Sequence, residues 1–267
     1  MKKYIAIIRI RFINSLQYRA AAIAGMATQF AWGLMEILAF SAFYRANPAA
    51  FPMEFSQTVS YIWMQQALLA LFMVWFFEGE IFASITSGGI AYELARPVDL
   101  YSRWFCQSMA NRLAKAVLRC FPILIVAFIV PEPFRMSLPV NAGQFILFLV
   151  SASLSLFVVV SFSMLIYIST FYTLSPMGVR LISAVLADFM AGATIPLPFF
   201  PPAFLTVAEL MPFAAMQNMP LRIYSGNIAG TDAALGIGLQ LFWLLVLVLI
   251  GRLLMKNALK RVVVQGG

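Results

Sequence analysis

The side chains that could carry out chemistry are few in this sequence, and they are widely spaced. Histidine is absent, and the two cysteines are Cys106 and Cys120. Histidine is the commonest general base and metal ligand, so its absence disfavours a catalytic dyad or a metal site. Only Glu78, Glu80 and Asp99 come near to forming an acidic cluster. No G-x-x-x-x-G-K-[ST] motif is present, so the chain is expected to bind no nucleotide phosphates by that route.

Charged residues inside long apolar runs are the other candidates for function. Glu36 and Asp188 each fall near the middle of such a run. A carboxylate at the centre of a bilayer costs about 2.5–3.5 kcal/mol on insertion scales, so each should face protein or water. Either acid could line a translocation path that favours cationic cargo. Alternatively, each could be protonated or paired with a cation from another helix.

Arg112, Lys115 and Arg119 recur at i, i+3 and i+7 and so would form a cationic stripe on one face of a helix. The simplest interpretation is a boundary at which long cationic side chains reach back to the headgroups. The alternatives are a site for lipid phosphate or the lining of an inner vestibule.

The composition indicates an integral membrane protein. The 267 residues are 63% hydrophobic and only 10% charged, whereas a soluble domain contains about 25% charged residues. The formal net charge is +8. Because the charged residues lie between apolar runs, we attribute them to the orientation of the chain in the membrane and not to binding of nucleic acid.

We therefore predict an all-α polytopic membrane protein in which residues 1–267 form a single transmembrane domain. Residues 1–19 are expected to form an amphipathic interfacial helix, with Ile5, Ile8 and Phe12 on its apolar face. The alternative is a frayed basic leader that only sets the topology. Six membrane spans are predicted from the apolar runs, at 20–44, 58–77, 105–130, 142–172, 177–194 and 233–255.

The distribution of cations predicts the topology. All but three of the 18 Lys and Arg residues fall on the side of the two termini; the exceptions are Arg45, Arg135 and Arg222. Cytoplasmic loops retain Lys and Arg, so both termini are expected in the cytoplasm, together with the polar loop 78–104. In that loop, Glu78 and Glu80 could cap the start of the segment or contact a partner.

A short helix is predicted inside this loop, because Gly88–Gly89 precede it and Arg96–Pro97 follow it. With six spans, this segment resembles the loop between spans two and three of the ABC-2 type permeases. Gly89, Leu94 and Pro97 match that family's pattern of Gly, Leu and Pro. The resemblance implies a coupling helix that docks on an ATPase, through Gly89, Tyr92, Glu93, Leu94, Arg96 and Pro97.

Residues 195–231 carry a second resemblance to the same family. Ala203–Met211 and Phe213–Pro220 could each be a short helix, and neither is long enough to span a bilayer. A re-entrant helical hairpin between spans five and six is therefore expected, with an ordinary apolar extracellular loop as the alternative. The residues that match the family's proline-rich entry and Pro…Tyr-x-Gly ending are Pro196, Pro198, Pro202, Pro212, Pro220, Tyr224 and Gly226.

The resemblance implies a permease subunit of an ABC exporter in the bacterial cytoplasmic membrane. Its expected partners are two copies of a separate ATPase, a second permease (identical or homologous) and membrane lipids, without nucleic acid. No cofactor is expected on this chain, because ATP and Mg would bind to the ATPase. Two alternatives stay open: a polytopic enzyme acting on lipid, and a membrane protein that confers immunity or senses a compound without transporting it.

Overall fold

A computed structural model describes residues 2–17, 19–173 and 175–262. Within these ranges the fold is entirely helical, as predicted, and contains no strand. Three helices are long and apolar enough to cross a membrane, namely residues Ile23–Ala46 of α2 and the whole of α8 and α12. The α-helices are α1 (Lys2–Ser15), α2 (Arg19–Ala46), α3 (Phe55–Ala67), α4 (Leu69–Phe72), α5 (Gly79–Thr86), α6 (Ile90–Leu94), α7 (Leu100–Ile129), α8 (Ala142–Thr173), α9 (Met177–Met190), α10 (Pro202–Leu210), α11 (Asn218–Ser225) and α12 (Gly230–Leu259).

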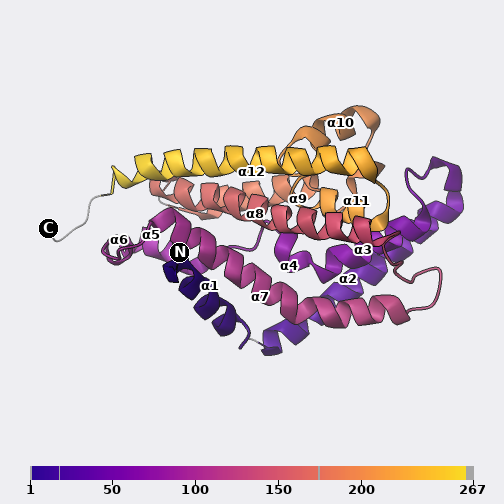
Figure 1. The fold of residues 1–267 in the computed structure, drawn as a ribbon, viewed down its shortest axis with the longest axis horizontal. Coiled ribbons are helices and arrows are strands. Elements are labelled where there is room, and N and C mark those ends of the chain that lie inside the picture. The colour runs from indigo at the N-terminus through magenta and orange to yellow at the C-terminus, as the bar shows by residue number, and fades with distance from the viewer. Residues whose placement is uncertain (1, 18, 174, 263–267) are drawn as a thin grey trace.

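Helices α8 and α12 lie side by side along the molecule and form its most extensive helix–helix contact (Figure 1). Gln240 of α12 is buried at this seam. Its Nε2 donates to Ser155 Oγ and to the Ala215 carbonyl oxygen, both at 2.9 Å, and its Oε1 accepts from Ser151 Oγ at 2.9 Å. The small side chains of Ser151 and Ser155 leave room for this amide at the seam and bond to it.

The region of the second predicted span, 58–77, does not form one unbroken helix. Helix α3 ends at Ala67, the single turn α4 ends at Phe72, and residues 73–78 are not helical. The run is apolar throughout, but hydropathy does not report whether each backbone carbonyl has a donor. Irregular backbone at this depth is stable only when protein groups replace the missing hydrogen bonds. Such a donor is present here and is described below.

The bounds of two other predicted spans also need correction. Helix α9 stops at Met190 instead of reaching 194, and its 14 residues extend only about 21 Å. Helix α7 begins at Leu100 instead of 105, because the Asp99 side chain accepts a hydrogen bond from Ser102 N at 2.8 Å and caps the helix.

Residues 195–231 contain two short helices, as predicted. Helix α10 closely matches the predicted first piece, whereas α11 begins at Asn218, five residues later than the second piece was placed. Gln144 Nε2 ties the end of α11 to α8 by donating to the carbonyl oxygens of Ile223 at 2.8 Å and Ile228 at 2.9 Å. Gly226 ends α11 with φ 78°, a left-handed conformation that favours glycine.

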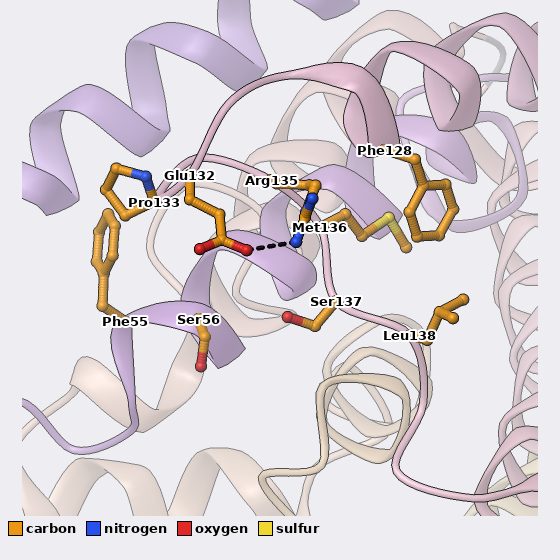
Figure 2. Close-up of a pocket in the computed structure, with 9 residues that line it drawn as sticks. All are labelled: Phe55, Ser56, Phe128, Glu132, Pro133, Arg135, Met136, Ser137 and Leu138. Carbon is orange, nitrogen blue, oxygen red and sulfur yellow. Dashed lines mark hydrogen bonds and ion pairs between the residues drawn. The ribbon is translucent and has the colours of Figure 1, made fainter.

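The two ends of the molecule differ in content. Helices α1, α5 and α6 and the last turns of α12 gather at one end, and the loop between α7 and α8 lies at the other (Figure 1). That loop borders a cavity of about 600 Å³ beside which Glu132 and Arg135 form an ion pair (Figure 2). The predicted topology places the start of the chain on the same side of the membrane as residues 78–104. It therefore requires α1 to lie at the same end of the molecule as α5 and α6.

Candidate docking segment and membrane cavity

Helix α6 presents apolar side chains to solvent at the end of the molecule. Gly88 turns the chain between α5 and α6 with φ 77°, a conformation that glycine adopts without strain. Ile90 is then buried, whereas Tyr92 is 80% exposed and Leu94 is 40% exposed. Arg96 and Pro97, which follow the helix, are also exposed. Of the predicted docking residues, these four are therefore accessible, and Gly89 is half-buried at the N-cap of α6.

Glu93, the remaining predicted docking residue, points inward. Its carboxylate forms an ion pair with Arg103 near the start of α7, and both side chains are largely shielded from solvent. Shielding strengthens such a pair relative to one on an open surface. The pair fixes the orientation of α6 relative to α7, so Glu93 positions the exposed residues instead of joining them.

Helix α1 is fastened to the same region. It packs along α7, and Ser15 Oγ donates to Asn111 Oδ1 at 2.8 Å. Lys3 Nζ donates to the Pro97 carbonyl oxygen at 3.0 Å, and Arg11 pairs with Glu80 at 2.7 Å. These contacts give Glu80, which the sequence left unassigned, a partner within the chain.

The interfacial helix predicted at 1–19 is shorter and turned differently. It covers Lys2–Ser15, while Met1 and Tyr18 lie outside the described residues. Of its expected apolar face, Ile8 and Phe12 are partly buried against the protein, whereas Ile5 is exposed. The reason is that α1 turns toward α7 and not only toward a lipid surface.

Glu78 is held inside the protein. Its backbone N donates to Tyr167 Oη at 2.8 Å, and it occupies the N-cap position of α5 without a side-chain cap. Burial raises the pKa of Glu78, and a hydrogen bond from Asn111 and the charges of Lys115 and Arg112 partly oppose this. The expectation that Glu78 caps the segment with its carboxylate is therefore wrong, whereas contact between Glu78 and a partner stays a prediction.

Arg112 is a buried structural residue. It is 1% exposed, and its Nη1 donates to the Met73 carbonyl oxygen at 2.7 Å. Its Nη2 donates to the Phe76 carbonyl oxygen at 2.7 Å and to Ser163 Oγ at 3.3 Å. The planar guanidinium thus supplies donors where the backbone after α4 is not helical. The interpretation of Arg112 as a boundary or lipid-binding residue is wrong, since it reaches neither surface.

Lys115 and Arg119 lie in surroundings different from those of Arg112. Lys115 Nζ lies 3.2 Å from the centroid of the Phe76 ring, a cation–π contact. Arg119 packs against α2 at Gly25, where a Cβ atom would lie 2.7 Å from Arg119 Cζ. The three cations of the predicted stripe therefore have different surroundings and do not form one common site.

Glu36 and Asp188 line one cavity of about 670 Å³, together with Arg119. The sequence singled out the two acids separately, and nothing in it indicated that they share a site. The cavity is bounded mainly by α2, by α3 with α4, and by the end of α9, and α7 contributes Arg119. Sequence reasoning did not assign a function to the polar residues that complete this lining, which are Thr28, Gln29, Gln65, Gln66 and Thr194.

Glu78, Glu80 and Asp99, the acids on which a lipid-modifying enzyme would have to rely, each make contacts within the chain. Glu80 pairs with Arg11, and Asp99 caps α7. Glu78 is turned inward beside Tyr167. Within the residues that the structure describes, no group of three or more His, Cys, Asp and Glu could hold a metal ion. This cluster therefore offers little support for the enzymatic alternative.

Exchanging the two charges of the Glu93–Arg103 pair tests whether it positions α6. Glu93→Arg alone should place two cations together, displace α6 and speed proteolytic cleavage of residues 88–97 at least about tenfold. The double variant Glu93→Arg/Arg103→Glu restores the attraction and should recover most of the protection. Limited proteolysis of the purified chain in detergent would measure this; equal loss of protection in the single and double variants would contradict a positioning role.

The family model described as ABC-2 family transporter protein matches residues 30–266. This range includes α6, every helix from α3 to α12, and the cavity lining except Gly25, Thr28 and Gln29. No curated protein matches the chain significantly.

Proposed function

The chain belongs to the ABC-2 family of transporter proteins, and on that premise we propose that it is the permease subunit of an ATP-driven exporter. The family and the apolar helices make it a multi-pass membrane component of a transporter. We place it in the bacterial cytoplasmic membrane with both termini in the cytoplasm, as its cation distribution favours. The six proposed crossings are α2, α3 with α4, α7, α8, α9 and α12.

The observation that carries this proposal is the exposed apolar surface of α6. Tyr92 and Leu94 project from the end of the molecule where α1 and α5 also lie (Figure 1). Aromatic and aliphatic side chains that project from a surface are typical anchors for a groove on another protein. We propose that two copies of a separate ATPase, which bind ATP and Mg, receive this segment in such a groove.

Helix α7 would carry movement from the docking segment to the cavity. Arg103 near its start holds α6 through Glu93, and Arg119 farther along the same helix lines the cavity. Helix α7 also contacts α1, α2, α3 and α4. A tilt of this single rigid element would therefore displace the docking segment and one wall of the cavity together.

A second permease, identical or homologous, would close the cavity. Exposed apolar side chains flank it on both sides, with Trp32 and Met35 on α2 and Leu181 and Val185 on α9. Large exposed apolar surfaces mark contacts with lipid or protein. In this arrangement the path lies between the two permeases, which agrees with the position of Glu36 and Asp188.

Copurification with an ATPase from the same organism, sought first among the products of neighbouring genes, tests the proposal. A tagged permease should retain that ATPase in a stable complex whose ATP hydrolysis requires the permease. A permease that purifies alone, with no ATP-dependent activity, would contradict it. Lipid turnover without any ATPase would support the enzymatic alternative, and ATP-independent binding of a toxic compound would support immunity or sensing.

A further inference from the structure

We propose that the cavity between α2, α3 and α9 binds an apolar organic cation that carries an N–H donor, such as an arylalkylammonium ion. This inference rests on the proposed function, since it names the class of cargo that the permease would accept. It follows from the hydrogen-bonding groups, charges, aromatic rings and size of the cavity.

Two buried amides supply unpaired acceptors to the cavity lining. Gln29 is 3% exposed and Gln65 is 2% exposed. Gln29 Nε2 donates to the Gln66 carbonyl oxygen at 2.9 Å, and Gln65 Nε2 donates to the Ala193 carbonyl oxygen at 2.7 Å. A backbone carbonyl oxygen can accept a hydrogen bond from the side-chain NH₂ of glutamine but not from its side-chain oxygen. These two bonds therefore determine the orientation of each side-chain amide, with Nε2 toward the carbonyl.

Among the described residues, the Oε1 atoms of Gln29, Gln65 and Glu36 have no hydrogen-bond partner. All three residues line the same cavity. Buried polar atoms are almost always paired, and an unpaired one costs about 1–3 kcal/mol. Arg119 lines the same cavity, and its Nε is a buried donor without a partner among the described residues. Unpaired acceptors therefore outnumber unpaired donors by three to one, which indicates that the missing donors belong to the occupant of the cavity.

The charges and rings of the lining favour a cation over an anion. Among the described residues that line the cavity, Glu36 and Asp188 are opposed by one cation, Arg119, so the formal charge of these residues is negative by one. Trp32 and Trp75 also line the cavity, and indole faces attract ammonium groups. An ammonium group would offer both the opposite charge and N–H donors for the unpaired acceptors.

The volume of the cavity suits a small molecule. At about 670 Å³, it lies within the range of about 300–1,000 Å³ that is typical of small-molecule sites.

Binding of matched probes to the purified permease, without ATPase, tests the proposal. The probes are 1-naphthylmethylammonium, its N-trimethyl analogue, which has the charge but no N–H, and the anion 1-naphthylacetate. Equilibrium dialysis in nanodiscs should show binding of the primary ammonium at least about tenfold tighter than of either analogue. Equal binding of all three would overturn the proposal.

Variants then locate the site. Glu36→Gln and Gln65→Leu should each weaken binding of the primary ammonium at least about fivefold. Glu132→Gln, which alters a different cavity beside the loop between α7 and α8 (Figure 2), should not change it. Unchanged binding in both cavity variants, with thermal unfolding confirming that they are folded, would overturn the proposal.

The results separate this inference from the proposed function. A permease that couples to its ATPase but binds none of the probes selectively would refute the cargo class alone. Selective binding of the ammonium by a chain that never engages an ATPase would refute the permease role and leave the site standing.

Discussion

Leu94→Asp is expected to abolish ATP-driven transport while the chain still folds and inserts. Leu94 is 40% exposed at the end of α6, so the substitution disturbs little inside this chain. In a complex, however, the new carboxylate would be removed from water in an apolar groove without a partner, which costs several kcal/mol. A loss of this size should reduce the affinity for the ATPase at least about a hundredfold.

The measurement compares copurification of the ATPase and ATP-driven transport in proteoliposomes. Leu138→Asp is the matched control, because Leu138 is 76% exposed in the loop at the opposite end of the molecule (Figure 2). This control should behave like the unaltered chain. If the Leu94 variant transported normally, or if both variants failed alike, α6 would not be the docking element.

Arg112→Met is expected to give the largest loss of stability of any single change considered. It leaves the carbonyl oxygens of Met73 and Phe76 without the donors that Arg112 supplies. Each unpaired buried carbonyl costs about 1–3 kcal/mol, so the free energy of unfolding should fall by about 2–6 kcal/mol. Since residues 73–78 connect α4 to α5, their release should also loosen the docking segment.

Thermal unfolding of the purified chain in detergent measures this effect. Arg112→Lys keeps the charge but lacks the planar fork that reaches both carbonyls, so it should recover only part of the stability. Arg45→Met removes an exposed arginine near the end of α2 and should change the free energy of unfolding by less than about 0.5 kcal/mol. An Arg112→Met variant as stable as this control would show that the segment does not depend on Arg112.

The sequence alone determined the class of protein and the place of the short helix α6. Both conclusions depend on local properties of the sequence. The apolar composition shows that most of the chain must be surrounded by lipid, and the glycines and the proline around α6 mark where a short helix begins and ends. Helix α8 matches its predicted span to within one residue at its C-terminus. Such a segment is a long uninterrupted apolar run, for which transfer free energy and helix formation agree.

Only the tertiary structure decided what the charged and amide side chains do. Glu36, Asp188 and Arg119 come from three helices that are distant in sequence, yet they line one cavity. Arg112 belongs to α7 but completes the hydrogen bonding of the segment that follows α4. Hydropathy sums the transfer free energy of residues one by one, whereas a buried charge is stabilised by partners that only the packing of distant helices brings within reach.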